Sequence, residues 1–142
     1  GVSHVGAHGV AGLHDLFQRS EPISYEKIKN QAPAKLLIGP WTHLQAATGS
    51  GLPVDGVPPL NHILLQWFDQ YVKGMAVGAD RQPNVTQYVS GHDHYVTATD
   101  WPNPQAQAQK LYLHGDKSLS TAAPAAGEAS NITVQEPINA VW

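Results

Sequence analysis

Cysteine is absent from this sequence of 142 residues, so the chain can form neither a disulfide bond nor a thiolate metal site. Charged residues are scarce at 13%, and the net charge of −3 offers no basic surface for nucleic acid. No apolar run approaches the roughly 18 residues that a membrane-spanning helix needs. These absences predict a globular protein with no nucleic-acid partner and no membrane partner.

The most informative segment runs from Lys35 to His43. Its apolar residues predict a buried strand of a parallel sheet, which Gly39-Pro40 ends. Trp41 and His43 follow on the loop, so an imidazole lies just past the carboxyl end of a strand, where open α/β sheets place reactive groups. Histidine exchanges protons near neutral pH, which makes His43 a candidate general base. From position alone, a loop histidine without a role is the alternative.

Asp15 precedes this histidine by one helix and one strand. Residues 18–31 predict the helix, with Ser20 as its N-cap, and the strand before Gly39 follows it. An acid followed one such unit later by a histidine is the order of the last two members of the α/β-hydrolase triad, Ser, Asp or Glu, and His. The order therefore makes Asp15 the candidate partner of His43.

Two segments resemble motifs of the CocE/NonD family, a group of serine hydrolases that contains esterases and X-Pro dipeptidyl peptidases. The family's GGWYDIF is similar to residues 12–17, and its LVIGPWSHG is similar to residues 36–43. The resemblance extends from about residue 12 to about residue 130. Weaker echoes occupy residues 65–74, 88–91, 100–102 and 111–114.

Carried over residue by residue, the resemblance gives Asp15 the place of the triad acid and His43 that of the triad base. Two positions depart from the family's pattern. Leu13 and His14 replace its aromatic pair before the aspartate, and Leu44 replaces the glycine that usually follows the histidine. We expect the first departure to alter the setting of the carboxylate and the second to crowd the loop while leaving the imidazole intact.

The chain contains no nucleophile for such a triad. Gly-x-Ser-x-Gly, the turn that exposes the reactive serine, occurs nowhere, and Gly49-Ser50-Gly51 follows the histidine, on the wrong side of the triad order. The resemblance implies that the nucleophile and the oxyanion-hole donors precede Gly1. We therefore expect a C-terminal piece of a longer hydrolase that is inactive alone and that acts, when complete, on a small-molecule ester or amide.

The pattern of predicted elements indicates an α/β fold over residues 1–75. Besides the strand at 35–38, a weak strand is expected at 2–5 or 7–10, and a long irregular loop at 44–59. A helix is expected from Leu60 to Val72, closed by Gly74. The resemblance implies that these elements are the end of an α/β-hydrolase domain.

Residues 76–142 show a different pattern, with short strands separated by turns. This spacing predicts an antiparallel β domain. The resemblance implies that it is the opening part of a β-sandwich of the jelly-roll type. The expected strands lie at residues 85–90, 95–97, 110–114 and 132–135.

The predicted half-domain leaves apolar surface uncovered, because two parallel strands cannot bury both faces or protect their own edges. We expect an oligomer, a partner chain that bears the serine portion, or partial disorder of residues 1–40. The apolar stripe of the predicted helix consists of Leu60, Ile63, Leu64, Trp67, Phe68, Tyr71 and Val72.

The remaining histidines give weak signals. His92-Asp93-His94 gathers two imidazoles and a carboxylate, but no other ligand converges on them, so we expect neither a metal nor another cofactor. Packing or surface roles are the simplest interpretation of His4, His8, His14, His62 and His114.

Two functions remain open. The first is acyl transfer by a serine hydrolase, in which His43 takes the proton of a serine outside the chain and Asp15 orients the imidazole. The second is a non-catalytic, β-rich binding or interaction module in which both residues merely pack. A serine elbow encoded upstream of Gly1 distinguishes the two.

Overall fold

The computed structural model describes residues 6–48 and 60–129. Contacts divide the chain into two compact units, Gly1–Gln105 and Ala106–Trp142. In the described ranges no helix is both long enough and apolar enough to cross a membrane.

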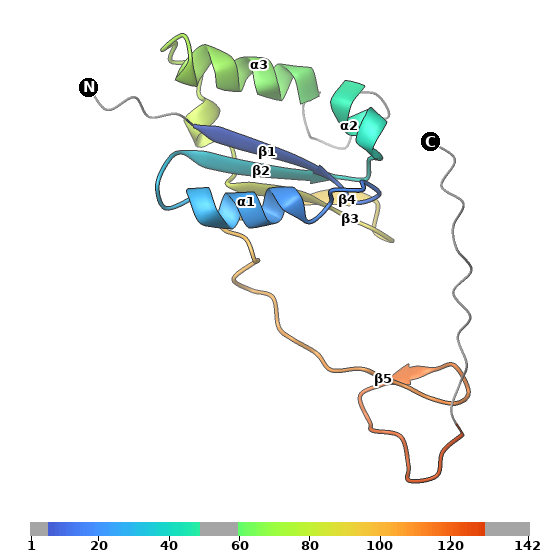
Figure 1. The fold of residues 1–142 in the computed structure, drawn as a ribbon. Coiled ribbons are helices and arrows are strands. Elements are labelled where there is room, and N and C mark those ends of the chain that lie inside the picture. The colour runs from blue at the N-terminus through green and yellow to red at the C-terminus, as the bar shows by residue number, and fades with distance from the viewer. Residues whose placement is uncertain (1–5, 49–59, 130–142) are drawn as a thin grey trace. The chain divides into compact units, whose positions relative to one another are not determined.

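A four-stranded mixed sheet forms the first unit (Figure 1). Its strands are β1 (Ala7–Gly12), β2 (Ala34–Gly39), β3 (Val85–Val89) and β4 (His94–Ala98), in the spatial order β1-β2-β3-β4. The first three run parallel, and β4 returns antiparallel to β3. This α/β arrangement agrees with the predicted fold class.

Helices cover both faces of this sheet, with α1 on one face and α3 on the other (Figure 1). Helix α1 (Ser20–Ile28) connects β1 to β2, α2 (His43–Thr48) follows β2, and α3 (Leu60–Tyr71) precedes the return to β3. The middle strand β2 is buried along nearly its whole length, which explains its continuous apolar sequence.

Each face has its own apolar cluster. On the face of α1, the buried residues are Ala11, Tyr25, Leu36, Ile38 and Val85. The opposite cluster consists of Leu37, Trp41, Leu60 and Ile63. Successive residues of β2 therefore point to opposite faces and hold the two helical layers to one sheet.

The boundary between the units lies after Gln105, not after residue 75 as the sequence indicated. Strands β3 and β4 were expected in the second domain, but the pairing of β3 with β2 places this hairpin in the first sheet. An ion pair of 2.7 Å between Lys29 and Asp100 also ties the end of β4 to the end of α1.

Lys35 provides a physical reason for this placement. It is the second residue of β2 and is buried, and its ammonium donates hydrogen bonds to the Asp80 carbonyl at 3.1 Å, to the Asn84 side-chain oxygen at 2.9 Å, and to the Gln82 carbonyl. The Leu36 N–H donates to the Asn84 carbonyl at 2.9 Å. These contacts bring the segment before β3 alongside β2.

Two glutamines of α3 also bind the segment that connects α3 to β3. The Gln66 amide donates to the Val77 carbonyl at 2.7 Å and accepts from the Gln82 amide at 2.7 Å. The Gln70 side-chain oxygen accepts the first N–H of the 3₁₀ turn Ala79–Arg81, also at 2.7 Å. This polar network has no periodic pattern in the sequence, which explains why the sequence predicted the hairpin as part of the second domain.

Local details also differ from the sequence expectations. Ser20 is the first residue of α1 rather than its N-cap, because the preceding turn already gives Arg19 a helical conformation and the Ser20 N–H donates to the Phe17 carbonyl at 2.8 Å. The expected loop at 44–59 begins inside a short helix, α2. Trp67 of α3 is buried, while Phe68 of α3 and Val72, the residue after this helix, are exposed, so the predicted stripe is only partly covered in the described chain.

The second unit contains a small antiparallel pair, β5 (Tyr112–Leu113) and β6 (Leu119–Ser120). The strand expected at 132–135 lies outside the described residues. The identification of residues 76–142 as the opening part of a jelly roll does not fit the β3–β4 hairpin, which joins the first sheet. Because a jelly roll needs about eight strands, it stays a prediction for the residues that follow Gln105.

Candidate active site

The two candidate residues come from the matched ends of adjacent parallel strands. Gly12 of β1 pairs with Gly39 of β2, so both strands finish at the same level. Backbone pairing then continues past the strands. The Leu13 N–H donates to the Gly39 carbonyl at 2.8 Å, and the His14 N–H donates to the Trp41 carbonyl at 3.0 Å. The segment leading to the aspartate is thereby fixed against the one leading to the histidine.

Trp41 fills the space beneath this pair of loops. Its indole is buried at 1% exposure in the cluster with Leu37 and Leu60. A Cβ at Gly39 would collide with the indole, and a Cβ at Gly12 would collide with the Trp41 carbonyl. Glycine is needed at both strand ends because the tryptophan approaches so closely.

Asp15 lies on the turn that follows β1. Its side chain is only 11% exposed, and its Oδ1 accepts the Phe17 N–H at 2.8 Å. The Asp15 N–H in turn donates to the Gly12 carbonyl at 3.2 Å. An aspartate that binds the backbone two residues ahead holds its own turn in place, so the carboxylate has a defined direction.

His43, the first residue of α2, meets this carboxylate. Its Nδ1 lies 3.1 and 3.2 Å from the two carboxylate oxygens of Asp15. The Phe17 ring packs edge-on against the imidazole, with centroids 5.6 Å apart and planes at 70°. The Leu44 side chain, which was expected to crowd the loop while leaving the imidazole intact, is 72% exposed. The ring of His43 is 54% exposed, and its Nε2 makes no hydrogen bond within the described chain.

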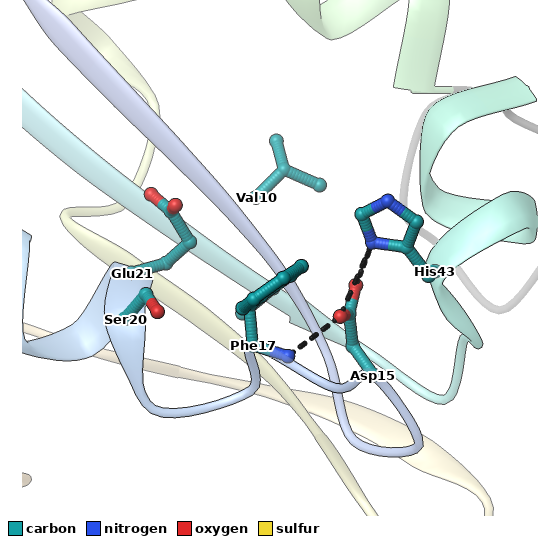
Figure 2. A pocket seen from close by; sticks show the side chains of 7 residues that line it. Val10, Asp15, Phe17, Ser20, Glu21 and His43 are labelled. Carbon is teal, nitrogen blue, oxygen red and sulfur yellow. Dashed lines mark hydrogen bonds and ion pairs between the residues drawn. The ribbon is translucent and has the colours of Figure 1, made fainter.

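Figure 2 shows the open cavity, about 380 Å³ in volume, into which this pair faces. Besides Asp15 and His43, it is lined by Val10, Ala11, Phe17, Ser20 and Glu21. Chemically, the arrangement provides a base whose tautomer is set by an acid, with the second ring nitrogen open to a reactant. Ser20, from the start of α1, makes no hydrogen bond to His43 in the described structure.

The structure thus brings together the two residues singled out from the sequence. Phe17 was missed as a neighbour of the imidazole. Its position two residues after the aspartate was the available signal, since that spacing is the one at which a backbone N–H reaches an aspartate side chain.

The histidines of the β3–β4 turn are arranged differently. The rings of His92 and His94 lie 5.7 Å apart, and the His94 Nδ1 lies 3.0 Å from the His92 carbonyl oxygen. The Asp93 carboxylate accepts the Tyr88 hydroxyl at 2.8 Å. These contacts stabilise a hairpin turn, and no group of three metal-ligating side chains gathers within residues 6–48 and 60–129.

Comparison with known proteins gives hydrolase-like relatives. No family model matches the chain. It is 26% identical over 118 residues to a cocaine esterase from Rhodococcus sp. (strain MB1 Bresler), a match that covers 79% of this chain and 21% of the esterase. It also resembles the crystal structure of an aminopeptidase from a marine sediment Thaumarchaeota archaeon, with a TM-score of 0.66 and 24% identity over 88% of this chain and 22% of that one. The chain spans about a fifth of the length of each relative, and the structural likeness shows the fold alone.

Proposed function

We propose that this chain carries the acid and the base of a serine acyl hydrolase of the CocE/NonD type. The observation that carries the proposal is the contact of 3.1 Å between the His43 Nδ1 and the Asp15 carboxylate, at the carboxyl ends of two adjacent parallel strands. The chain order of acid and base, and the likeness to an esterase sequence, support the same assignment.

In this mechanism the Asp15 carboxylate accepts a hydrogen bond from the His43 Nδ1–H, which keeps its proton. The imidazole is then held in the tautomer whose Nε2 has a free electron pair. That nitrogen takes the proton of an attacking serine hydroxyl and returns it to the leaving alcohol or amine. Asp15 stabilises the imidazolium that forms between the two transfers, so the overall reaction cleaves an ester or an amide.

We further propose that the serine and the oxyanion-hole donors belong to a part of the protein outside these 142 residues. The chain contains no Gly-x-Ser-x-Gly sequence and no cysteine, and its matches cover only 21% and 22% of the two relatives. The cavity at the pair is open, which leaves room for the missing groups. A small-molecule ester or amide is then the substrate of the complete protein.

The coding sequence before Gly1 provides the first test, because the proposal requires a Gly-x-Ser-x-Gly elbow there. If this elbow is absent, the proposal fails and the result favours the non-catalytic binding module. With the extended protein, kcat/KM is measured on p-nitrophenyl esters. We expect His43→Gln and Asp15→Asn to lower kcat by roughly 10³–10⁴-fold, as for other triads.

His62→Gln is the matched control, since it makes the same substitution at an exposed histidine of α3. It should leave kcat/KM within about twofold of the unaltered protein, as expected for a surface change away from the site. Equal losses in His43→Gln and His62→Gln would contradict the assignment of His43 as the base.

A further inference from the structure

We propose that Ser120, His114 and Glu128 form a second reactive site, in which Ser120 is a nucleophile that small activated esters acylate. His114 Nδ1 lies 3.0 and 3.1 Å from the two Glu128 carboxylate oxygens, and its Nε2 lies 2.9 Å from the Ser120 hydroxyl oxygen. A nucleophile bound to a base, which is itself oriented by a carboxylate, is the arrangement that activates serine. All three residues belong to the second unit, and the inference does not depend on the proposed function.

The Glu128 carboxylate is held in place by the backbone. Its two oxygens accept the Gly115 N–H at 2.8 Å and the Ala125 N–H at 3.3 Å. These bonds orient the carboxylate toward the imidazole, and the side chains of His114 and Glu128 are only 17% and 27% exposed. The carboxylate therefore fixes the ring and favours a proton on Nδ1, as the acid of a triad does.

The serine is brought to the base by the hairpin. Tyr112 of β5 pairs with Ser120 of β6, and the turn between the strands closes when the His114 N–H donates to the Ser118 carbonyl at 2.9 Å. A histidine just after β5 and a serine at the end of β6 thus meet on one side of a tight turn. Their contact follows from local pairing, so it forms wherever the hairpin forms.

An open cavity of about 430 Å³ gives a small acyl donor access to the serine. The side chains and backbone of the turn form its walls, and Ser120, His114 and Glu128 all line it. The remaining lining residues are Gly115, Asp116, Ser118 and Ala129.

The reaction on p-nitrophenyl acetate would proceed in one displacement. The Ser120 oxygen attacks the carbonyl carbon and forms the new O–C bond, while its proton passes to the His114 Nε2. The p-nitrophenolate leaves with the electron pair of the broken C–O bond, and the imidazolium releases its proton to water. The product is O-acetyl-Ser120.

Neighbouring backbone groups limit this site to acylation without rapid turnover. The Ala122 N–H donates to the Ser120 oxygen at 3.1 Å, where it stabilises developing negative charge on the nucleophile. The Ala122 carbonyl accepts the Ser120 hydroxyl at 3.2 Å and thus competes with the base for this proton; it also lies 3.2 Å from the His114 Nε2, where it can accept a hydrogen bond from the imidazolium. This N–H points at the nucleophile rather than at a bound carbonyl oxygen, so we expect about one acetyl group per chain.

The pH dependence follows from the charges around the base. The Glu128 carboxylate, with a smaller contribution from Asp116 in the turn, raises the pKa of His114. The imidazole must be neutral to accept the serine proton. The acylation rate should therefore rise with pH through the pKa of His114 and then level off.

The test treats the full chain with p-nitrophenyl acetate and locates acetyl groups by peptide mass spectrometry. Ser118 is an internal control, because it lines the same cavity. Its backbone N–H donates to the Asp116 carboxylate, and the base His114 lies against the Ser120 hydroxyl instead. We expect Ser120 to react at least about tenfold faster than Ser118 in the folded chain and no faster in urea. Equal rates in the folded chain, or acetyl groups on lysine and histidine only, would overturn the proposal.

Variants then test whether His114 itself acts as the base. His114→Gln should slow acetylation of Ser120 by about a hundredfold, whereas His92→Gln, the same change at an exposed histidine, should not alter it. If His114→Gln unfolds the hairpin, the pH profile of the unaltered chain decides. A plateau above the pKa of His114 supports the site, and a rate that rises about tenfold per pH unit throughout contradicts it.

Discussion

Among the residues that the structure describes, two histidine–carboxylate pairs have nearly the same contact distance but are held in place differently. In the first unit, His43 meets Asp15 across 28 positions of sequence, at the ends of two parallel strands. In the second, His114 meets Glu128 across 14 positions, within one hairpin and the loop that follows it. The Nδ1–oxygen distances are 3.1 and 3.0 Å, respectively.

The difference lies in what each pair depends on. The pair of Asp15 and His43 exists because Trp41 packs beneath both loops, so it depends on a core assembled from distant segments. The pair of His114 and Glu128 is held by nearby backbone N–H groups and by charge. Core substitutions should therefore abolish the first pair, whereas pH should act on the second.

Trp41→Ala should have the largest effect. Removing a fully buried indole costs about 3–5 kcal/mol of unfolding free energy, and it removes the support of both site loops. Urea denaturation measures the loss, and NMR signals of His43 and His114 show which pair is affected. We expect the His43 signal to change strongly and that of His114 to persist. Val72→Ala, at an exposed side chain just after α3, should cost less than about 0.5 kcal/mol.

The first pair could be predicted from the sequence because its determinants are local patterns. An apolar run ended by Gly39-Pro40 marks the end of a buried strand, and such strand ends meet at one edge of a parallel sheet. Helix α3 was likewise predictable from its 3.6-residue period, which gave its start at Leu60. The catalytic role of Asp15 and His43 stays a prediction, since geometry alone does not show chemistry.

Lys35→Met tests whether long-range polar contacts hold the β3–β4 hairpin in the first unit. The ammonium has three acceptors on the segment that leads into β3, and methionine leaves them unpaired at a largely buried position. We expect a loss of about 2–3 kcal/mol and faster hydrogen exchange in β3. Lys27→Met, on an exposed face of α1, is the matched control. Equal stability of the two variants would refute the role given to Lys35.

This network is also why the position of the hairpin escaped sequence analysis. A lysine at the start of a strand and scattered glutamines on a helix have no period that predicts burial. The backbone carbonyls that Lys35 binds lie 45 or more positions away in the sequence. The contact of His114 with Ser120 and Glu128 escaped for a related reason. It depends on a two-residue strand pair whose register the residue types do not specify.

Gly39→Ala probes the close approach of Trp41 more selectively than removal of the indole does. The added methyl group would meet the ring, so we expect overpacking to cost about 1–3 kcal/mol and to move the loop that carries His43. Gly91→Ala is the comparison, because its Cβ would enter open space and only a positive φ opposes it. Stronger perturbation of His43 by Gly91→Ala than by Gly39→Ala would be incompatible with this packing.

The smallest expected effect concerns pH and the second pair. The hydrogen bond that the Glu128 carboxylate accepts from the imidazole raises the pKa of His114 above 6.5, so the contribution of His114 to stability is complete below pH 6.5 and is lost as the pH rises through the raised pKa. The hydrogen bond from the Gly115 N–H, followed by the one from His114, lowers the pKa of Glu128. The contribution of Glu128 to stability is therefore present above pH 4.5 and is lost as the pH falls through the lowered pKa.

NMR titration of His114 should give a midpoint above 6.5, and Glu128→Gln should lower this midpoint because the negative charge is removed while the amide can still bind the ring. Added salt should lower the midpoint of the unaltered chain as well, since the pair is partly exposed. An unchanged midpoint in Glu128→Gln, with the hairpin signals intact, would show that the carboxylate does not control the protonation of His114.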